Sequence, residues 1–96
     1  MTSTTEQRFV GVDIQDDEQN RAVVEAIEAT NPDCTVQHLP GLVRIKCAGR
    51  LVITRDSVEE KLGRDWETHE FQMAIGSYFG HIKDWDDDEI VIAWDH

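Results

Sequence analysis

The sequence predicts an α+β fold: a single small domain in which two helices pack on a mostly antiparallel β-sheet. The chain of 96 residues is long enough for one hydrophobic core and one domain. Several short segments alternate apolar and polar residues, as half-buried strands do, and no repeat or low-complexity linker separates them. Two other segments begin with the residue spacing that starts a helix.

The chain is predicted to begin with a polar, flexible tail at residues 1–7, followed by the domain at residues 8–96. The first strand is predicted at residues 9–14, where every second side chain is apolar. A helix is then predicted to begin at Asp16, because Asp16 and Gln19 have the spacing of a capping box.

This helix ends at Asn31-Pro32, since proline cannot continue a helix. Two strands are predicted next, at residues 34–39 and 42–48, with a turn at Pro40-Gly41. The second of these alternates clearly, with three apolar side chains on one face and basic side chains on the other.

Gly49-Arg50 is predicted to be a two-residue hairpin turn that returns the chain into a strand at residues 51–54. A second, short helix is predicted to begin at Asp56, which has a glutamate three residues later, and to end at Gly63.

The remaining strands are predicted at residues 68–75 and 89–94, with a break at residues 76–80. The alternation in the first of them would place four side chains on one face: His69, Phe71, Met73 and Ile75. The predicted order is therefore strand, helix, three strands, short helix and two strands.

The chain is strongly acidic, with 20 acidic and 9 basic residues and a net charge of −11. Such a surface argues against a protein that coats phosphates or docks on an anionic membrane. No stretch reaches the ~20 apolar residues of a membrane span, and the first residues lack a secretory signal. We expect a cytoplasmic protein, monomeric when free, with no nucleic acid and no membrane as partner.

The two cysteines, Cys34 and Cys47, are too few for a disulfide scaffold or an iron–sulfur cluster. In a cytoplasmic protein both thiols are predicted to be reduced. Cys47 alternates with Val43 and Ile45, which predicts a small, buried, apolar side chain.

No motif for metal, nucleophilic or phosphate chemistry has the required spacing. His69-Glu70 begins a zinc protease motif, but Met73 stands where the second histidine is needed. The acidic run at residues 84–89 lacks the turn glycine of a calcium loop, so a solvated acidic turn is predicted. Ser77 lacks the preceding glycine of a nucleophile elbow. The sequence thus predicts no catalytic residue, metal or cofactor, and favours a binding or regulatory protein.

Much of the chain matches a known pattern by the order and spacing of its residues. The segments that carry the match are His38-Leu39-Pro40-Gly41-Leu42-Val43-Arg44-Ile45, Gly49-Arg50-Leu51-Val52-Ile53, Val58-Glu59-Glu60-Lys61-Leu62-Gly63-Arg64, Trp66-Glu67-Thr68-His69-Glu70-Phe71 and Ser77-Tyr78-Phe79-Gly80-His81-Ile82. The chain resembles the regulatory (effector or coupling) proteins of bacterial soluble di-iron monooxygenases, and the phenol hydroxylase type is the most similar.

The resemblance implies a protein without metal, flavin or catalytic residue, whose partner is the large di-iron oxygenase (hydroxylase) component. Proteins of this family bind that component over the helices that hold its di-iron centre. Binding shifts the component between conformations, and so tunes oxygen activation, substrate access and the coupling of NADH oxidation to hydroxylation. The resemblance therefore implies a non-catalytic effector of a phenol-type monooxygenase in aromatic hydrocarbon catabolism.

The resemblance also implies where the partner is contacted. The implied contacts lie in a loop and at the end of the first helix: Gly76, Ser77, Tyr78, Phe79, Asn31 and Pro32. An equally good interpretation of the loop is a turn with Phe79 in the core. The two are compatible if Ser77 and Tyr78 point outward while Phe79 points inward.

A different class remains open at this point, an acidic DNA mimic that inhibits a DNA-binding enzyme. The net charge of −11 suits a mimic, which displays its carboxylates as a duplex-like stripe. Six of the nine basic residues would interrupt such a stripe: Arg44, Lys46, Arg50, Arg55, Lys61 and Arg64. A small enzyme is a third class, which the failed motif searches disfavour.

Overall fold

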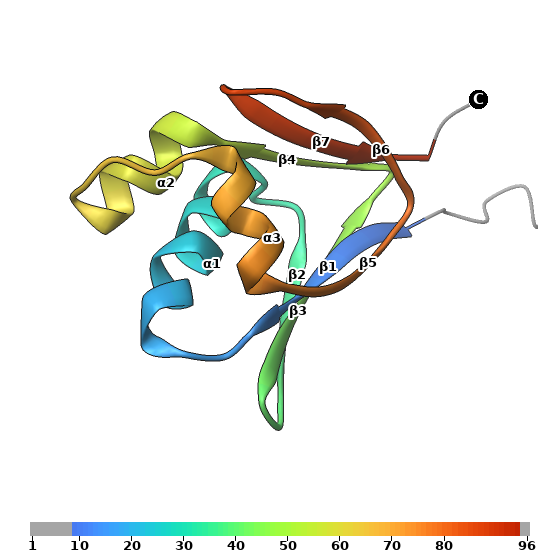
Figure 1. The fold of residues 1–96 in the computed structure, drawn as a ribbon. Coiled ribbons are helices and arrows are strands. Elements are labelled where there is room, and N and C mark those ends of the chain that lie inside the picture. Colours follow the sequence, from blue (N-terminus) through green and yellow to red (C-terminus); the bar gives the residue numbers. More distant parts are fainter. Residues whose placement is uncertain (1–8, 95–96) are drawn as a thin grey trace, which may run out of the picture.

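The computed structural model describes residues 9–94 and confirms the α+β class (Figure 1). The predicted tail at residues 1–7 lies outside the described residues. In chain order the elements are β1 (Phe9–Gln15), α1 (Glu18–Thr30), β2 (Thr35–Leu39), β3 (Leu42–Ala48), β4 (Arg50–Thr54), α2 (Arg55–Leu62), the 3₁₀ helix η2 (Thr68–Glu70), α3 (Phe71–Ala74), β5 (Ile75–Phe79), β6 (His81–Trp85) and β7 (Glu89–Ala93). In the described part of the chain, no helix is long and apolar enough to cross a membrane.

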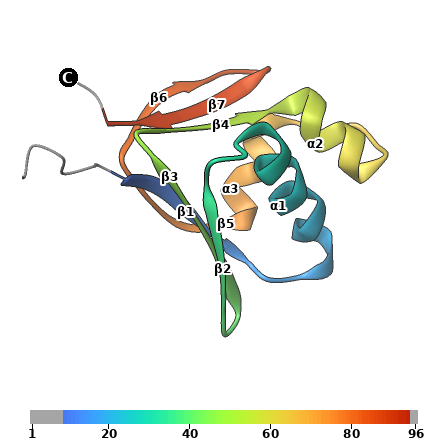
Figure 2. The same ribbon diagram turned by 180° about the vertical axis from the view of Figure 1, so that it is seen from behind.

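The strands form two antiparallel sheets, one of four strands in the order β2-β3-β1-β5 and one of three in the order β4-β7-β6. The helices lie on one side of the four-stranded sheet, and the three-stranded sheet crosses one end of the molecule (Figures 1 and 2). We call the face of the four-stranded sheet that is turned away from the helices its outer face.

The hydrophobic core fills the space between the two sheets and the helices. β1 turns Val10, Val12 and Ile14 into this core, as its alternation predicts, and none of the three is exposed. α1 contributes four buried side chains at helical spacing: Val23, Val24, Ala26 and Ile27. Burial of these apolar side chains is the main force that holds α1 against the sheets.

Both long helices begin at a different residue from the predicted one. α1 is capped by Asp17, whose carboxylate accepts a hydrogen bond from the amide of Asn20 at 2.9 Å. Asp16 lies between β1 and α1, and its amide donates to the carbonyl of Gly41 at 3.1 Å. α2 is capped by Thr54 rather than Asp56. Its predicted end at Gly63 is confirmed, where the backbone adopts the left-handed conformation with φ +76°.

The predicted hairpin at Gly49-Arg50 is wrong, because β3 and β4 belong to different sheets. β3 pairs with β2 along one edge and with β1 along the other, so neither edge is free for β4. Gly49, with φ +82°, instead turns the chain from one sheet into the other.

The strand predicted at residues 68–75 is also wrong, since η2 and α3 occupy this segment. Its buried residues are Thr68, Phe71 and Ala74, which recur at the helical spacing of three. Met73 would share a strand face with Phe71, yet it is 82% exposed. The apolar alternation was therefore accidental, and the true signal was the capping box between Glu67 and Glu70.

The two cysteines form a disulfide, which corrects the prediction of reduced thiols. Thr35 pairs with Lys46 in the β2–β3 ladder, and this register brings Cys34 opposite Cys47. The register of two strands is a tertiary property that the spacing of two cysteines does not reveal. The predicted burial of Cys47 is confirmed, since it is 2% exposed.

Candidate functional site

The predicted contact loop at residues 76–79 is a strand. It forms most of β5, which lies at the edge of the four-stranded sheet and pairs with β1 only. Gly76 and Ser77 are exposed, Tyr78 is 48% exposed and Phe79 is half-buried. Being an edge strand, β5 can present both its side chains and its free backbone edge to another protein.

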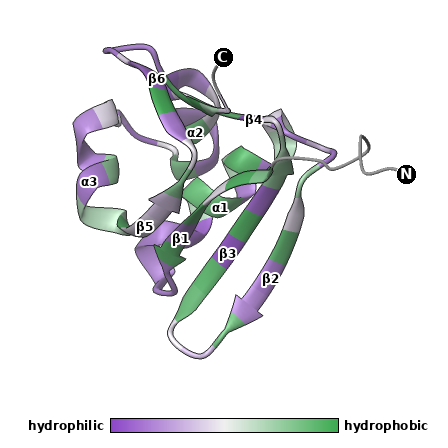
Figure 3. Cartoon of the chain, turned by 90° about the vertical axis from the view of Figure 1, so that its right-hand side faces the viewer, coloured by the Kyte–Doolittle hydropathy of each residue, from purple (hydrophilic) through white to green (hydrophobic). Residues whose placement is uncertain are grey.

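Phe79 is not in the core, contrary to the inward orientation considered for it. It pairs with Gly11, and a Cβ atom on Gly11 would lie 2.7 Å from the Phe79 ring. The ring therefore crosses Gly11 on the outer face of the sheet, where glycine leaves the necessary space. Because side chains alternate along a strand, Ser77 shares this face and Tyr78 takes the opposite side of β5. Figure 3 looks onto the outer face, with β5 at one edge and β2 at the other.

One buried carboxylate on the outer face connects three strands. Asp13 of β1 accepts hydrogen bonds from Arg44 of β3, at 2.8 Å from Nε and 3.1 Å from Nη2. The hydroxyl of Ser77 in β5 donates to the same carboxylate at 3.0 Å. Asp13 is only 6% exposed, so a carboxylate without these donors would be costly at this position.

The surroundings of Asp13 keep it ionised. Through its hydrogen bonds, the Arg44 guanidinium lowers the pKa of Asp13 below its ordinary value; burial opposes this shift, and the Ser77 hydroxyl adds to it. The sequence shows that Asp13 and Arg44 point away from their apolar neighbours, but the register that pairs them is seen only in the structure.

Replacing Asp13 by asparagine is expected to reduce the free energy of unfolding at pH 7 by about 1–2 kcal/mol. Because the pKa of Asp13 is lowered by folding, its stabilising effect is present above its ordinary pKa of about 4 and is lost as the pH falls through the folded-state value. Urea unfolding at pH 7, 5 and 3 checks this. A difference between Asp13→Asn and the parent that stays constant down to pH 3 would contradict the assignment.

The second predicted contact, Asn31 and Pro32, lies at the other edge of the sheet. Two residues separate them from the start of β2, and β3 and β1 lie between β2 and β5. Three strand spacings of about 4.8 Å place the two edges roughly 14 Å apart or more. The structure therefore does not bring the two groups of predicted contact residues together.

Asn31 itself has a structural role. Its side-chain amide donates to the carbonyls of Ile27 at 2.9 Å and Val52 at 2.7 Å, and its side-chain oxygen accepts from the amide of Val52 at 3.0 Å. β4 is an edge strand, and Asn31 thus satisfies both backbone groups of Val52 on its unpaired edge. Pro32, which is exposed, is the member of the pair that is available to a partner.

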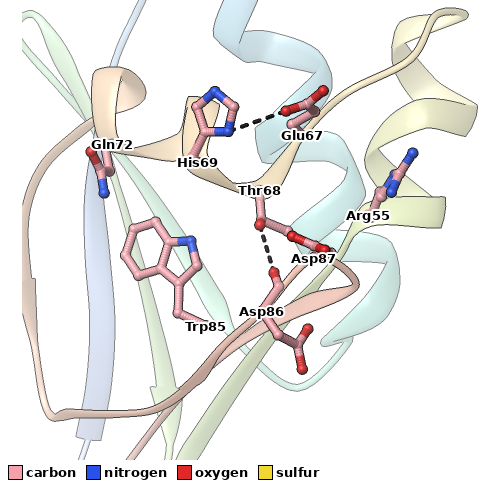
Figure 4. Close-up of a pocket in the computed structure, with 8 residues that line it drawn as sticks. All are labelled: Arg55, Glu67, Thr68, His69, Gln72, Trp85, Asp86 and Asp87. Carbon is pink, nitrogen blue, oxygen red and sulfur yellow. Dashed lines mark hydrogen bonds and ion pairs between the residues drawn. The ribbon is translucent and has the colours of Figure 1, made fainter.

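A polar cleft of about 540 Å³ separates η2 and α3 from the turn between β6 and β7 (Figure 4). Its lining comprises Arg55, Glu67, Thr68, His69, Gln72, Trp85, Asp86 and Asp87. The hydroxyl of Thr68 donates to the backbone carbonyl of Asp86 at 2.6 Å. His69 contacts Glu67 at 3.2 Å, and both side chains are exposed.

The acidic turn predicted at residues 84–89 is shorter in the structure: residues 86–88 form it and are exposed, whereas Asp84 belongs to β6 and Glu89 to β7. Asp86 accepts hydrogen bonds from the amides of Asp88 at 2.8 Å and Glu89 at 2.9 Å, and these bonds lower its pKa. Within residues 9–94, no three His, Cys, Asp or Glu side chains are grouped so as to hold a metal ion.

Residues 8–93 match the sequence model of the MmoB/DmpM family, and the chain belongs to this family. It is 42% identical over 86 residues to the stimulatory component DmpM of phenol 2-monooxygenase from Pseudomonas sp. (strain CF600). That match covers 90% of this chain and 94% of the relative.

Solved structures agree with this assignment. A chain in a phenol hydroxylase–regulatory protein complex is 40% identical, with a TM-score of 0.87 over 92% of this chain and 100% of the other. A second such complex gives 37% identity and a TM-score of 0.82, over 91% of this chain and 100% of the other. Regulatory protein B of soluble methane monooxygenase shares the fold at 21% identity, with a TM-score of 0.71 over 99% of this chain and 71% of its own.

Proposed function

We propose that this chain is the regulatory component of a multicomponent, phenol-type aromatic monooxygenase. It is not an enzyme and carries no cofactor; it binds the large di-iron hydroxylase component. Through this binding it tunes oxygen activation, substrate access and the coupling of NADH oxidation to hydroxylation. It acts in the cytoplasm and is monomeric when free.

The observation that carries this proposal is the match to a chain in a phenol hydroxylase–regulatory protein complex. At 40% identity and a TM-score of 0.87 over the whole of that chain, no large insertion or deletion separates the two folds. A regulator acts by binding one conformation of its partner more tightly than another, so it needs a defined surface rather than reacting groups.

Reconstitution tests the proposal. The purified chain is added in increasing amounts to the hydroxylase component, its reductase and NADH, and phenol hydroxylation and NADH consumption are both measured. We expect the rate, and the product formed per NADH, to rise and to saturate near one chain per active site. No binding by calorimetry, together with unchanged rate and coupling, would refute the proposal.

For the contact surface, we propose β5 with residues Gly76, Ser77, Tyr78 and Phe79, and a second area at Asn31 and Pro32. Tyr78 is the strongest member, because a half-exposed aromatic side chain on an edge strand has the character of an interface anchor. Ser77 is bound to Asp13 and Asn31 to β4, so both act mainly by holding the backbone in place.

Replacing Tyr78 by alanine is expected to weaken binding to the hydroxylase by about 2 kcal/mol, or roughly thirtyfold, without unfolding the domain. Phe9→Ala is the matched control, since Phe9 is a comparably exposed aromatic residue at 40% and lies on the outer face of β1. Calorimetric titration and thermal melting check both variants. Equal weakening by the two variants, or none by Tyr78→Ala, would contradict the role of Tyr78.

Ser77→Asp also weakens activation under this proposal, but for a different reason. A carboxylate at position 77 would face the carboxylate of Asp13, and the resulting repulsion would displace β5. Tyr78→Ala is therefore the cleaner probe of direct contact.

A further inference from the structure

We propose that Asp13 is a positioning residue: its carboxylate, through Ser77, holds β5 in the register in which that strand meets the hydroxylase. This inference rests on the proposed function, because it concerns how the contact strand is kept ready for the partner. Asp13 itself is 6% exposed and lies one strand away from the proposed contact surface.

β5 needs such an anchor because its own pairing is weak. It is five residues long and pairs with β1 along a single edge. Its register shifts opposite Asp13 and Ile14, because Ser77 pairs with Asp13 whereas Ile75 pairs with Ile14. Gly76 is thus an extra, unpaired residue that bulges out of the ladder directly before Ser77.

The side-chain hydrogen bond from Ser77 to Asp13 lies next to this interruption. The bulge removes a backbone pair at Gly76, and the 3.0 Å hydrogen bond supplies a connection between β1 and β5 at the following residue. A hydrogen bond to an ionised acceptor is stronger than one between neutral groups. It can therefore fix which residue of β5 lies opposite Asp13.

Arg44 holds the Asp13 carboxylate in place from the side of β3. Its guanidinium holds both oxygens of Asp13 from β3, a central strand that is itself paired on both sides. Through these bonds, the position of the edge strand β5 is fixed relative to the two inner strands of the sheet. The side chain of Arg44 is 42% exposed, whereas that of Asp13 is 9% exposed.

The first experiment compares Ser77→Ala with Ser77→Thr, which keeps the hydroxyl. Thr35→Ala is the control, because it removes a hydroxyl from β2, the opposite edge strand of the same sheet. Hydrogen exchange of residues 75–79 is followed by mass spectrometry, and affinity for the hydroxylase by calorimetry. For Ser77→Ala we expect exchange about tenfold faster and binding about five- to tenfold weaker, with both restored in Ser77→Thr and unchanged in Thr35→Ala.

A second variant, Asp13→Asn, removes the charge while keeping the shape of the acceptor. We expect it to accelerate hydrogen exchange in β5 as Ser77→Ala does. Exchange in the double variant, Asp13→Asn with Ser77→Ala, should be little faster than in either single variant. Exchange at residues 75–79 that is unchanged in Ser77→Ala would overturn the inference, as would faster exchange with unchanged affinity. If the unaltered chain does not bind the hydroxylase at all, it is the proposed function that fails.

Discussion

Replacing Phe71 by alanine is expected to lower the free energy of unfolding by about 3–5 kcal/mol, the range for a large aromatic side chain removed from a core. Phe71 has no exposed surface and packs edge-on against Trp85, with ring centroids 6.2 Å apart. It is one of the two buried residues of the short helix α3, the other being the much smaller Ala74. For a domain of this size the melting temperature should fall by roughly 12 °C or more.

Met73→Ala is the control for this variant, because it lies in the same helix and is 82% exposed. Its effect on the free energy of unfolding should stay within about 0.5 kcal/mol. Thermal and urea unfolding of the two variants distinguish the observed helix from the predicted strand. In a strand, both side chains would share one face and both substitutions would be costly. Similar losses for Phe71→Ala and Met73→Ala would contradict the observed packing.

Replacing Asn31 by alanine is expected to cost about 2–3 kcal/mol of stability. The variant would leave both the amide and the carbonyl of Val52 without the side chain that now satisfies them, at 3.0 and 2.7 Å. It would also remove the bond to Ile27 at the end of α1. An unsatisfied pair of groups on the edge of β4 costs more than the net value of the hydrogen bonds that are lost.

Urea unfolding measures this cost, with Asp33→Ala as a neighbouring exposed control that should change the free energy of unfolding by less than about 0.5 kcal/mol. Asn31 was predicted to be a partner contact on resemblance alone. If Asn31→Ala proved as stable as the parent but bound the hydroxylase weakly, the contact role would stand and the structural role would be wrong.

Local patterns correctly predicted those elements in which the spacing of apolar residues alone indicates the type of element and its buried face. The alternation of Val10, Val12 and Ile14 is enough to define β1, and the apolar spacing from Val23 to Ile27 is enough to define the buried face of α1. The α+β class follows from the order of such segments. Element boundaries moved by one or two residues, as at Asp17, because the capping residue depends on where the preceding strand ends.

Tertiary pairing could not be predicted in this way. The Gly49-Arg50 turn has the form of a hairpin, and it fails as one because both edges of β3 are already occupied by distant strands. The disulfide and the bond between Asp13 and Ser77, which are 64 residues apart, depend equally on register. Register is fixed by the whole sheet and not by any one strand.

The candidate site was predicted by resemblance, with no contribution from composition or spacing. Net charge alone suited a DNA mimic as well as a regulator, and it is the likeness to the stimulatory component of a phenol monooxygenase that separates the two. Within residues 76–79, the structure turns Phe79 onto the outer face and ties Ser77 to Asp13, leaving Tyr78 as the most exposed aromatic side chain of β5.

The strand order has a consequence for how the protein is made. β1, first in the chain, is an inner strand of its sheet, and β7, last in the chain, is the central strand between β4 and β6. A nascent chain still lacking β7 would hold β4 and β6 with no strand to join them. Folding dominated by such distant pairings is slow. The three-stranded sheet should therefore form only once β7 has emerged from the ribosome.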